Sequence, residues 1–273
     1  MASQLAMTPS AIDDDPRPLA FYDVHAHLAD ERISDQAQEI LAASAAAGVR
    51  GIVAAAARRQ EWDCIEALAE ESIVYGALGI HPFFLDDWGD ETAEELAGRC
   101  GRNQQVRAVG EIGLDFQHGR DQAARQIEVL TAQLRVAAAR QLPVILHNRK
   151  SWSDFFGLLR DLGIDELRGV CHHFTGSREI ARKALDLGLY LSFCGPLTYP
   201  NAHRLKAMAR FVPADRMLTE TDSPDLPGAA YRGQMSSPPQ VRDVVEEIAR
   251  VRQVSTTAVA AQIAENFEAL FGP

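Results

Sequence analysis

Short apolar runs alternate along this chain with longer stretches in which apolar and polar residues follow a helical period. Eight of the apolar runs read as strands, and each is followed by helical sequence. They are apolar on both faces, which is typical of parallel strands covered by helices. We therefore predict an α/β fold, a single (β/α)8 TIM barrel with parallel strands; a doubly wound open sheet is the alternative. The strand-like runs span residues 21–25, 51–56, 73–80, 106–112, 143–147, 169–174, 189–195 and 216–222.

Glycine and proline mark the boundaries of the predicted elements. Gly48, Gly163 and Gly188 each stand just before an apolar run, where the end of a helix commonly takes glycine. The segment 223–239 is rich in proline and glycine, so we expect an irregular loop that overhangs the strand ends. Residues 1–20 are polar, and we predict a disordered tail there, ahead of a barrel domain at 21–273. The predicted helices cover 34–48, a stretch ending at 70, 91–98, 122–141, 152–162, 177–187, 201–211, 239–252 and 256–270.

Composition narrows the classes of function. The formal net charge of −11 disfavours a protein that coats a polyanion. An enzyme acting on nucleic-acid ends stays compatible, because bound metals and local cations can supply positive charge. The four cysteines form no CxxC pair and are expected to be reduced thiols. No apolar run is long enough to span a bilayer and no leader pattern is recognisable, so we expect a cytoplasmic monomer without membrane contact.

Side chains that bind metals gather at the C-terminal ends of the predicted strands. Parallel barrels build their sites at this rim, so residues far apart in the sequence would meet there. Imidazoles and carboxylates are ligands for divalent metals. Each of these residues alone could be a buried core residue, but several strand ends contribute one at the same time. They are His25, His27, His81, Glu111, His147, His172, His173 and Asp222.

Local context sharpens three of these positions. His25 and His27 are two residues apart on a strand, so both rings point to the same face and can reach one ion. Asp23 shares that face and could orient a ligand, or simply fill the core. Glu111 interrupts an otherwise apolar strand, where a carboxylate needs a partner. That partner is either a buried salt bridge or a pair of metal ions.

The donors suffice for two divalent ions that share one carboxylate. Two such ions can activate a water and stabilise the leaving oxygen of a phosphoryl group. Asp222 would also take the proton from the attacking water, so Asp222 and Glu111 are the candidate catalytic residues. His81 and Arg149 have no obvious ligand position and are candidates to bind a substrate phosphate; an exposed polar role is the alternative. His173 could fill the pocket wall. The assignment is His25, His27 and Asp222 on one ion, His147 and His172 on the other, and Glu111 between them.

A series of motifs runs from about residue 21 to the C-terminus: DVHAHL, GIHP, AVGEIGLDF, LPVILHNR, HHFTGS, GPLTYPNA and TETDSPDLP. In order and spacing they resemble the TatD family of metal-dependent deoxyribonucleases, within the amidohydrolase-like TIM barrels. SPDLP and the RGQ that follows are most similar to the YjjV-like branch. The resemblance implies a two-metal site on the six ligands above, with His81 and Arg149 as substrate contacts. It also implies exonuclease action from the 3′ end of single-stranded DNA, with Mg²⁺, Mn²⁺ or Zn²⁺.

Two positions depart from the family pattern, and both concern the substrate. His173 stands where small or thiol residues are common, and the segment 232–238 lacks the Asn-Glu-Pro of the main branch. Every expected ligand is present. The leading hypothesis is a two-metal 3′–5′ exodeoxyribonuclease that acts on single-stranded ends. The alternatives are hydrolysis of another ester, such as an aminoacyl-tRNA, a phosphoester or a lactone, and an interaction protein on a retained barrel.

Overall fold

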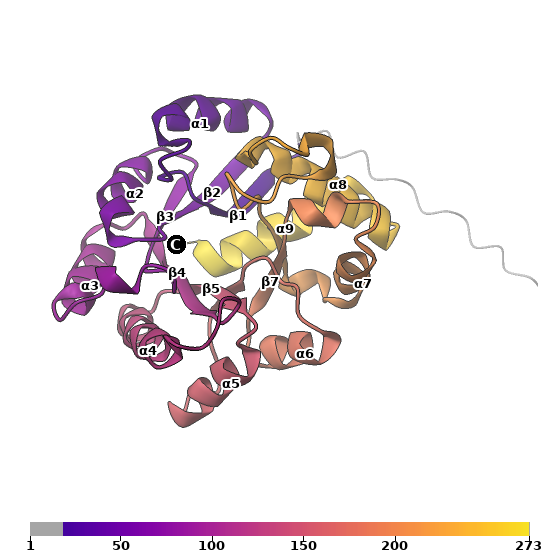
Figure 1. Cartoon of the computed structure of the whole chain (residues 1–273). Helices are drawn as coiled ribbons and strands as arrows, with labels where there is room; N and C mark the ends of the chain where they lie inside the picture. The colour runs from indigo at the N-terminus through magenta and orange to yellow at the C-terminus, as the bar shows by residue number, and fades with distance from the viewer. Residues whose placement is uncertain (1–18, 273) are drawn as a thin grey trace, which may run out of the picture.

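In the computed structural model, which describes residues 19–272, eight strands form one sheet in the order β1 to β8, with every neighbouring pair parallel (Figure 1). The strands are β1 (Phe21–Ala26), β2 (Val49–Ala55), β3 (Val74–Leu78), β4 (Val106–Asp115), β5 (Val144–Arg149), β6 (Gly169–Cys171), β7 (Tyr190–Phe193) and β8 (Met217–Thr219). The α-helices are α1 (Ala37–Ala46), α2 (Trp62–Leu68), α3 (Thr92–Arg102), α4 (Ala123–Arg140), α5 (Trp152–Asp161), α6 (Arg178–Asp186), α7 (His203–Phe211), α8 (Val241–Arg252) and α9 (Thr256–Phe271). Short 3-10 helices are η1 (Ser34–Gln36), η2 (Arg59–Glu61), η3 (Leu85–Asp87), η4 (Gly195–Thr198), η5 (Ala214–Arg216), η6 (Ala229–Tyr231) and η7 (Pro238–Gln240). This alternation of strands and helices confirms the predicted (β/α)8 barrel.

The sheet closes between its first and last strands, at the end that carries the candidate ligands. Ala26 forms a parallel bridge with Ser223. The backbone N–H of His27 donates to the carbonyl of Ser223 at 2.7 Å, and that of Asp222 donates to the carbonyl of His25 at 2.9 Å. A closed barrel has no free strand edges, so the open-sheet alternative is wrong.

Glycine occupies positions where other residues would be strained, either by a positive φ or by a close approach of two strands. The three glycines predicted at helix ends, Gly48, Gly163 and Gly188, have φ values of +89°, +67° and +90°. In β4, a Cβ on Gly113 would lie 1.8 Å from the carbonyl oxygen of His147 on the paired strand β5. Glycine therefore permits the close approach of the two strands that carry central site residues.

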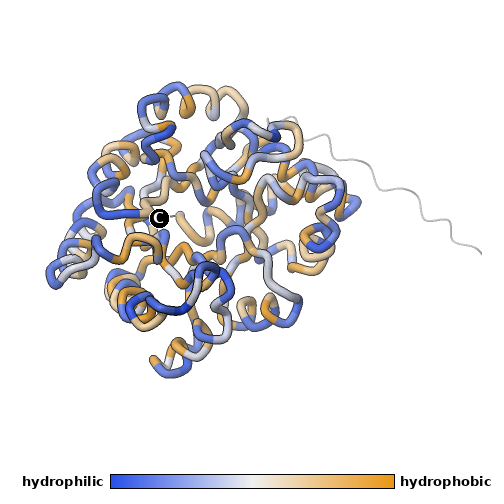
Figure 2. The backbone as a smooth tube through the Cα atoms, in the orientation of Figure 1, coloured by the Kyte–Doolittle hydropathy of each residue, from blue (hydrophilic) through white to orange (hydrophobic). Residues whose placement is uncertain are grey.

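Hydrophobic side chains of the strands fill the barrel and pack against the surrounding helices. Figure 2 shows mostly hydrophobic colour on the central strands, with hydrophilic stretches on the outer helices. Helix α9 crosses the N-terminal end of the barrel (Figure 1), where Asn266 donates to the carbonyls of Met217 at 2.7 Å and Ala214 at 2.8 Å. Within residues 19–272, no helix is both long and apolar enough to cross a membrane. The predicted tail at 1–20 lies, up to residue 18, outside the described residues.

The segment after β8 is irregular, as predicted, apart from the two short 3-10 helices η6 and η7. It reaches over the strand ends, where the guanidinium of Arg32 donates to both carboxylate oxygens of Asp225 at 2.9 and 2.8 Å. The same guanidinium donates to Asp30 at 2.8 Å. These charge-assisted bonds join the loop after β1 to the loop after β8 across the mouth of the barrel.

Candidate metal centre

A cavity of about 580 Å³ opens at the C-terminal ends of the strands. The predicted ligands come together there, although they belong to strands spread over the whole sequence. His25 lies behind the cavity wall and is fully buried. The other predicted site residues that line the cavity are His27, His81, Glu111, His147, Arg149, His172, His173 and Asp222.

Four of these residues form a first cluster of ligand atoms. The Nε2 atoms of His25 and His27 are 3.1 Å apart. The Oδ1 atom of Asp222 lies 3.4 Å from the first nitrogen and 3.6 Å from the second. The Oε2 atom of Glu111 lies 3.5 Å from His25 Nε2 and 3.4 Å from His27 Nε2. Two imidazole nitrogens and two carboxylate oxygens thus point at one small volume.

The other carboxylate oxygen of Glu111 faces a second cluster. Its Oε1 atom lies 2.9 Å from His147 Nδ1 and 2.8 Å from His172 Nε2, and these two nitrogens are 3.2 Å apart. His81 Nε2 lies 3.6 Å from the same oxygen. Glu111 therefore stands between two pairs of histidines and turns one oxygen toward each pair.

The spacing of these atoms fits divalent cations. Ligand atoms about 2.1 Å from a tetrahedral ion are about 3.4 Å from one another. Within the two clusters, the ligand atoms are separated by 2.8 to 3.6 Å. A donor set rich in imidazole suits Zn²⁺ or Mn²⁺ better than Mg²⁺, which prefers oxygen ligands. The residues present are thus able to hold metal ions in both clusters.

Hydrogen bonds on the side of the ring away from the cluster determine the tautomer of two of the histidines. His27 Nδ1 lies 3.1 Å from the carbonyl oxygen of Ala55, so the N–H is on Nδ1 and the lone pair is on Nε2. His147 has the opposite arrangement. Its Nε2 lies 2.9 Å from Oδ2 of Asp115, so Nε2–H donates and the lone pair is on Nδ1. When either ring is neutral, the nitrogen that faces the cluster carries the lone pair and can bind a cation.

Two buried carboxylates near the clusters were not predicted from the sequence. Asp115, at the end of β4, receives the His147 ring and also accepts from the backbone N–H of Gln117 at 2.7 Å. Glu220, just after β8, accepts from the backbone N–H of His173 at 2.6 Å and from the Ser192 hydroxyl at 2.5 Å. A signal for Asp115 exists in the sequence, because it shares the strand face of Glu111; none marks Glu220.

Asp23 is buried as predicted but holds the backbone rather than a ligand ring. Its Oδ1 atom accepts from the backbone N–H groups of His25 at 3.2 Å and Thr221 at 3.0 Å. Its Oδ2 atom accepts from the Thr221 hydroxyl. Burial raises the pKa of this carboxyl to about 8. Asp23 thus joins β1 to the segment after β8 and supports the position of His25 through the main chain.

The charges within the clusters depend on one another. Burial alone would raise the pKa of Glu111, but the neighbouring imidazoles, His172 foremost, hold it well below its usual value. Burial is outweighed in the same way at Asp222, whose pKa is lowered mainly by the neighbouring His27 imidazole. Burial lowers the pKa of His25. At His27 burial acts in the same direction, but Asp222 and Glu111 raise the pKa to about 9. Protons and cations therefore compete for the same ring nitrogens.

The two predicted substrate contacts both lie on the cavity. His81 Nδ1 accepts a hydrogen bond from the backbone N–H of Phe83 at 3.1 Å. Burial lowers the pKa of this ring to about 3, so it is neutral and carries its proton on Nε2, which faces Glu111. Arg149 is exposed at the end of β5 and lines the cavity wall, as does His173. A neutral N–H donor and a full cation are thus available at this wall.

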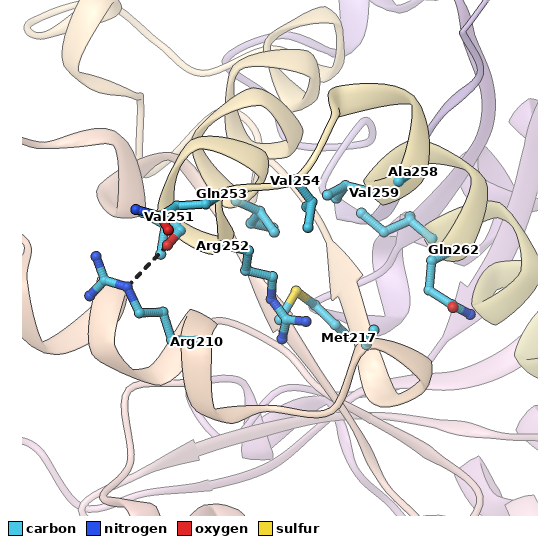
Figure 3. A pocket seen from close by; sticks show the side chains of 12 residues that line it. Arg210, Met217, Val251, Arg252, Gln253, Val254, Ala258, Val259 and Gln262 are labelled. Atoms are coloured by element: carbon cyan, nitrogen blue, oxygen red, sulfur yellow. Dashed lines mark hydrogen bonds between the residues drawn. The ribbon is translucent and has the colours of Figure 1, made fainter. Parts of the chain in front are cut away.

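A second cavity, of about 650 Å³, lies at the opposite end of the barrel among α7, α8 and α9 (Figure 3). Its polar lining consists of Arg210, Arg252, Gln253 and Gln262, and Arg210 donates to the carbonyl of Val251 at 3.0 Å. None of its lining residues is a carboxylate or an imidazole. We therefore assign the chemistry to the smaller cavity, which holds both.

Comparisons with known proteins find a matching family model, similar sequences and a similar structure. A family model described as TatD related DNase matches residues 22–272. The metal-dependent hydrolase YabD of Bacillus subtilis is 34% identical, over 92% of this chain and 98% of its own length. The 3′-5′ ssDNA/RNA exonuclease TatD of Cronobacter turicensis is 35% identical, over 75% of this chain and 78% of its own. The crystal structure of YjjV, a TatD homologue from Escherichia coli, superposes with a TM-score of 0.87 at 32% identity and covers 93% of this chain and 98% of that one.

Proposed function

The chain belongs to the TatD-related DNase family and is a metal-dependent hydrolase, and from this premise we propose that it removes nucleotides from the 3′ end of single-stranded DNA. The observation that carries the proposal is the position of Glu111, which turns one carboxylate oxygen toward each of two histidine pairs. The relative named as a 3′-5′ ssDNA/RNA exonuclease supports the choice of substrate. The exposed Arg149 beside the cluster supports a phosphate-containing substrate.

In this proposal, His25, His27 and Asp222 would hold one ion. His147 and His172 would hold the other, and Glu111 would be shared between the two. The ligand-atom separations given above support this division, because each group is compact and the two groups meet at Glu111. When bound, such a pair of ions supplies a water of lowered pKa and positive charge close to the phosphoryl oxygens.

Asp222 is proposed to accept the proton of the attacking water. Its carboxylate lines the cavity, and its lowered pKa keeps it deprotonated at neutral pH. The backbone N–H of Asp222 donates to the carbonyl of His25 at 2.9 Å, so the main chain fixes its position relative to that ligand. The proposed role of Asp222 as proton acceptor therefore rests on its position beside the ligand atoms.

His81 and Arg149 are proposed to bind the phosphate. His81 offers an Nε2–H donor that burial keeps neutral, and this donor faces the cluster. Arg149 supplies a permanent positive charge from the end of β5, and its fork of N–H groups matches two phosphate oxygens. Together they would orient the scissile bond, which is a large part of catalysis of phosphoryl transfer.

The test is hydrolysis of labelled oligonucleotides by the full chain with added Mn²⁺, Mg²⁺ or Zn²⁺. We expect single-nucleotide products from a 5′-labelled single strand that shortens from its 3′ end, and slower attack on a blunt duplex. The Glu111→Gln variant serves as the control for contaminating nucleases. Full metal occupancy without nucleotide release would contradict the proposal and would favour the alternative, hydrolysis of another ester such as an aminoacyl-tRNA, a phosphoester or a lactone.

A further inference from the structure

One aromatic side chain at the mouth of the site is left exposed. Among residues 19–272, three large hydrophobic side chains are exposed: Phe83 at 54%, Met235 at 47% and Val254 at 50%. Phe83 is the one that lines the candidate catalytic cavity. A single exposed hydrophobic residue is ordinary on a protein surface, so its location carries the inference.

The Phe83 ring continues the aromatic surface of the site. Its centroid lies 4.6 Å from that of His81, at an interplanar angle of 74°, and 6.3 Å from that of His147. On the outer side, the centroid of the exposed His118 ring lies 6.2 Å away. A series of aromatic rings, inclined to one another, therefore leads from the second cluster of ligands outward to the rim.

The backbone holds Phe83 in this place. Its N–H donates to His81 Nδ1 at 3.1 Å, so the phenyl ring and the proposed phosphate donor are positioned together. The next residue, Phe84, packs instead against the core and beneath Arg58, whose guanidinium carbon lies 4.7 Å from the ring centroid. Both phenylalanines line the cavity, but Phe84 is partly buried in the core, whereas the Phe83 ring is exposed.

The opposite side of the cavity has a different character. There Asp30 and Asp225 line the wall, and both are bound to Arg32. The charged groups on this side are already hydrogen-bonded to one another, whereas the exposed ring of Phe83 has no such partner on its outer face. Phe83 and Arg149 supply the two surfaces that a nucleotide needs, an aromatic face for the base and a cation for the phosphate.

We propose that Phe83 is the platform of a nucleobase subsite, on which the base of the 3′-terminal nucleotide stacks while its phosphodiester reaches the metal centre. The inference rests on the proposed function, because it assumes a nucleotide in the cavity. Stacking of a base on an aromatic side chain tolerates any base, since every base has a π face. The subsite therefore requires a base but does not discriminate among base sequences.

The first test measures binding of a mononucleotide to the full-length, metal-loaded protein. In Phe83→Trp, deoxyadenosine 5′-monophosphate is expected to quench tryptophan fluorescence beyond the change seen in the wild type. Deoxyribose 5-phosphate, which lacks the base, is expected to leave this signal unchanged. Equal responses to the two ligands, or no response to either, would overturn the subsite.

The second test compares matched truncations. Phe83→Ala should raise the Kd for deoxyadenosine 5′-monophosphate at least about five-fold, the lower end of the range for a stacked base. Phe83→Leu, which keeps an apolar side chain but removes the π face, should weaken binding to a similar extent. Met235→Ala is the control, because it also truncates an exposed apolar side chain but lies outside the cavity lining. Unchanged affinity in Phe83→Ala would overturn the inference.

The outcomes separate this inference from the proposed function. If Phe83→Ala hydrolyses the oligonucleotide normally and binds the mononucleotide with unaltered affinity, the proposed nuclease activity is retained and the proposed subsite is overturned. Absence of oligonucleotide hydrolysis by the wild type with every metal refutes the nuclease. In that case the mononucleotide titration still decides whether a base stacks on Phe83.

Discussion

Replacing Asp115 with asparagine should impair metal binding by changing the tautomer of a ligand that the substitution does not touch. His147 presents Nδ1 to Glu111 and His172 because its Nε2–H donates to Asp115 Oδ2 at 2.9 Å. Asparagine has the same shape, and its oxygen can keep the bond from the backbone N–H of Gln117, at 2.7 Å in the wild type. The amide NH₂ then faces His147 Nε2. It can donate only if the ring proton moves to Nδ1, the atom that a metal requires.

The expected magnitude follows from the role of such partners. Loss of a group that orients a metal-binding histidine typically costs 10- to 100-fold in metal affinity, or about 1.4 to 2.7 kcal/mol. Asp115 is 3% exposed, so solvent does little to screen its hydrogen bond with His147. We expect Asp115→Asn at the upper end of that range, because it favours the wrong tautomer. Asp115→Ala should fall at the lower end, because a water can replace the carboxylate and leave the tautomer free to change.

Titration calorimetry with Mn²⁺ or Zn²⁺ measures the affinity, and ¹⁵N chemical shifts of the His147 ring report the tautomer. Asp23→Asn is the matched control, since Asp23 is also a buried aspartate beside a ligand. Its hydrogen bond with His25 involves the backbone N–H of that residue and leaves the imidazole ring untouched. Its metal affinity should stay within about three-fold of the wild type. Wild-type affinity in Asp115→Asn, or a larger loss in Asp115→Ala than in Asp115→Asn, would refute the tautomer argument.

Four further predictions concern the clusters themselves. Glu111→Gln should lower bound metal from about two ions per chain to about one or fewer and abolish hydrolysis; elemental analysis beside an activity assay checks this, and an active, metal-depleted variant would contradict the shared role. Asp222→Asn should lower kcat by about 10²- to 10⁴-fold and change KM much less; steady-state kinetics at saturating metal decide, and unchanged turnover would remove Asp222 from the mechanism. Metal affinity should rise with pH, because the pKa of His27 is raised to about 9 and those of His147 and His172 are also raised, so cations must displace protons up to that pH. The stability of the folded protein without metal should change with pH in the opposite direction to the metal affinity. The contribution of protonated His27 to that stability is complete below its ordinary pKa of 6.5 and is lost as the pH rises past about 9. Metal affinity that does not depend on pH between about 6 and 9 would contradict the proton competition.

The fold was predictable because its signals are local. Apolar runs marked every strand, and the glycines at 48, 163 and 188 marked helix ends that have positive φ. The histidines and carboxylates after those runs could be placed together because parallel strands bring their C-terminal ends to one rim. The expected loop over the site also forms, and its Asp225 is bound to Arg32 across the mouth of the barrel.

The supporting residues were harder to predict because their partners are distant in the sequence. The expected strand ended at residue 112, whereas β4 continues to Asp115 through pairing with β5. That extension brings Asp115 to His147. Glu220 finds its partners in Ser192 and the backbone of His173, and no local pattern connects these positions. The sequence left two roles open for Asp23, orienting a ligand or filling the core, and its nearest donors are backbone and hydroxyl groups.

The central claim is that one glutamate lies between two metal-binding groups at the mouth of this barrel. Anomalous X-ray diffraction from crystals soaked in Mn²⁺ or Zn²⁺ tests it most directly. The account predicts two peaks, one among His25, His27 and Asp222 and one between His147 and His172, with the Glu111 carboxylate contacting both. A single peak, or peaks away from these six side chains, would contradict it.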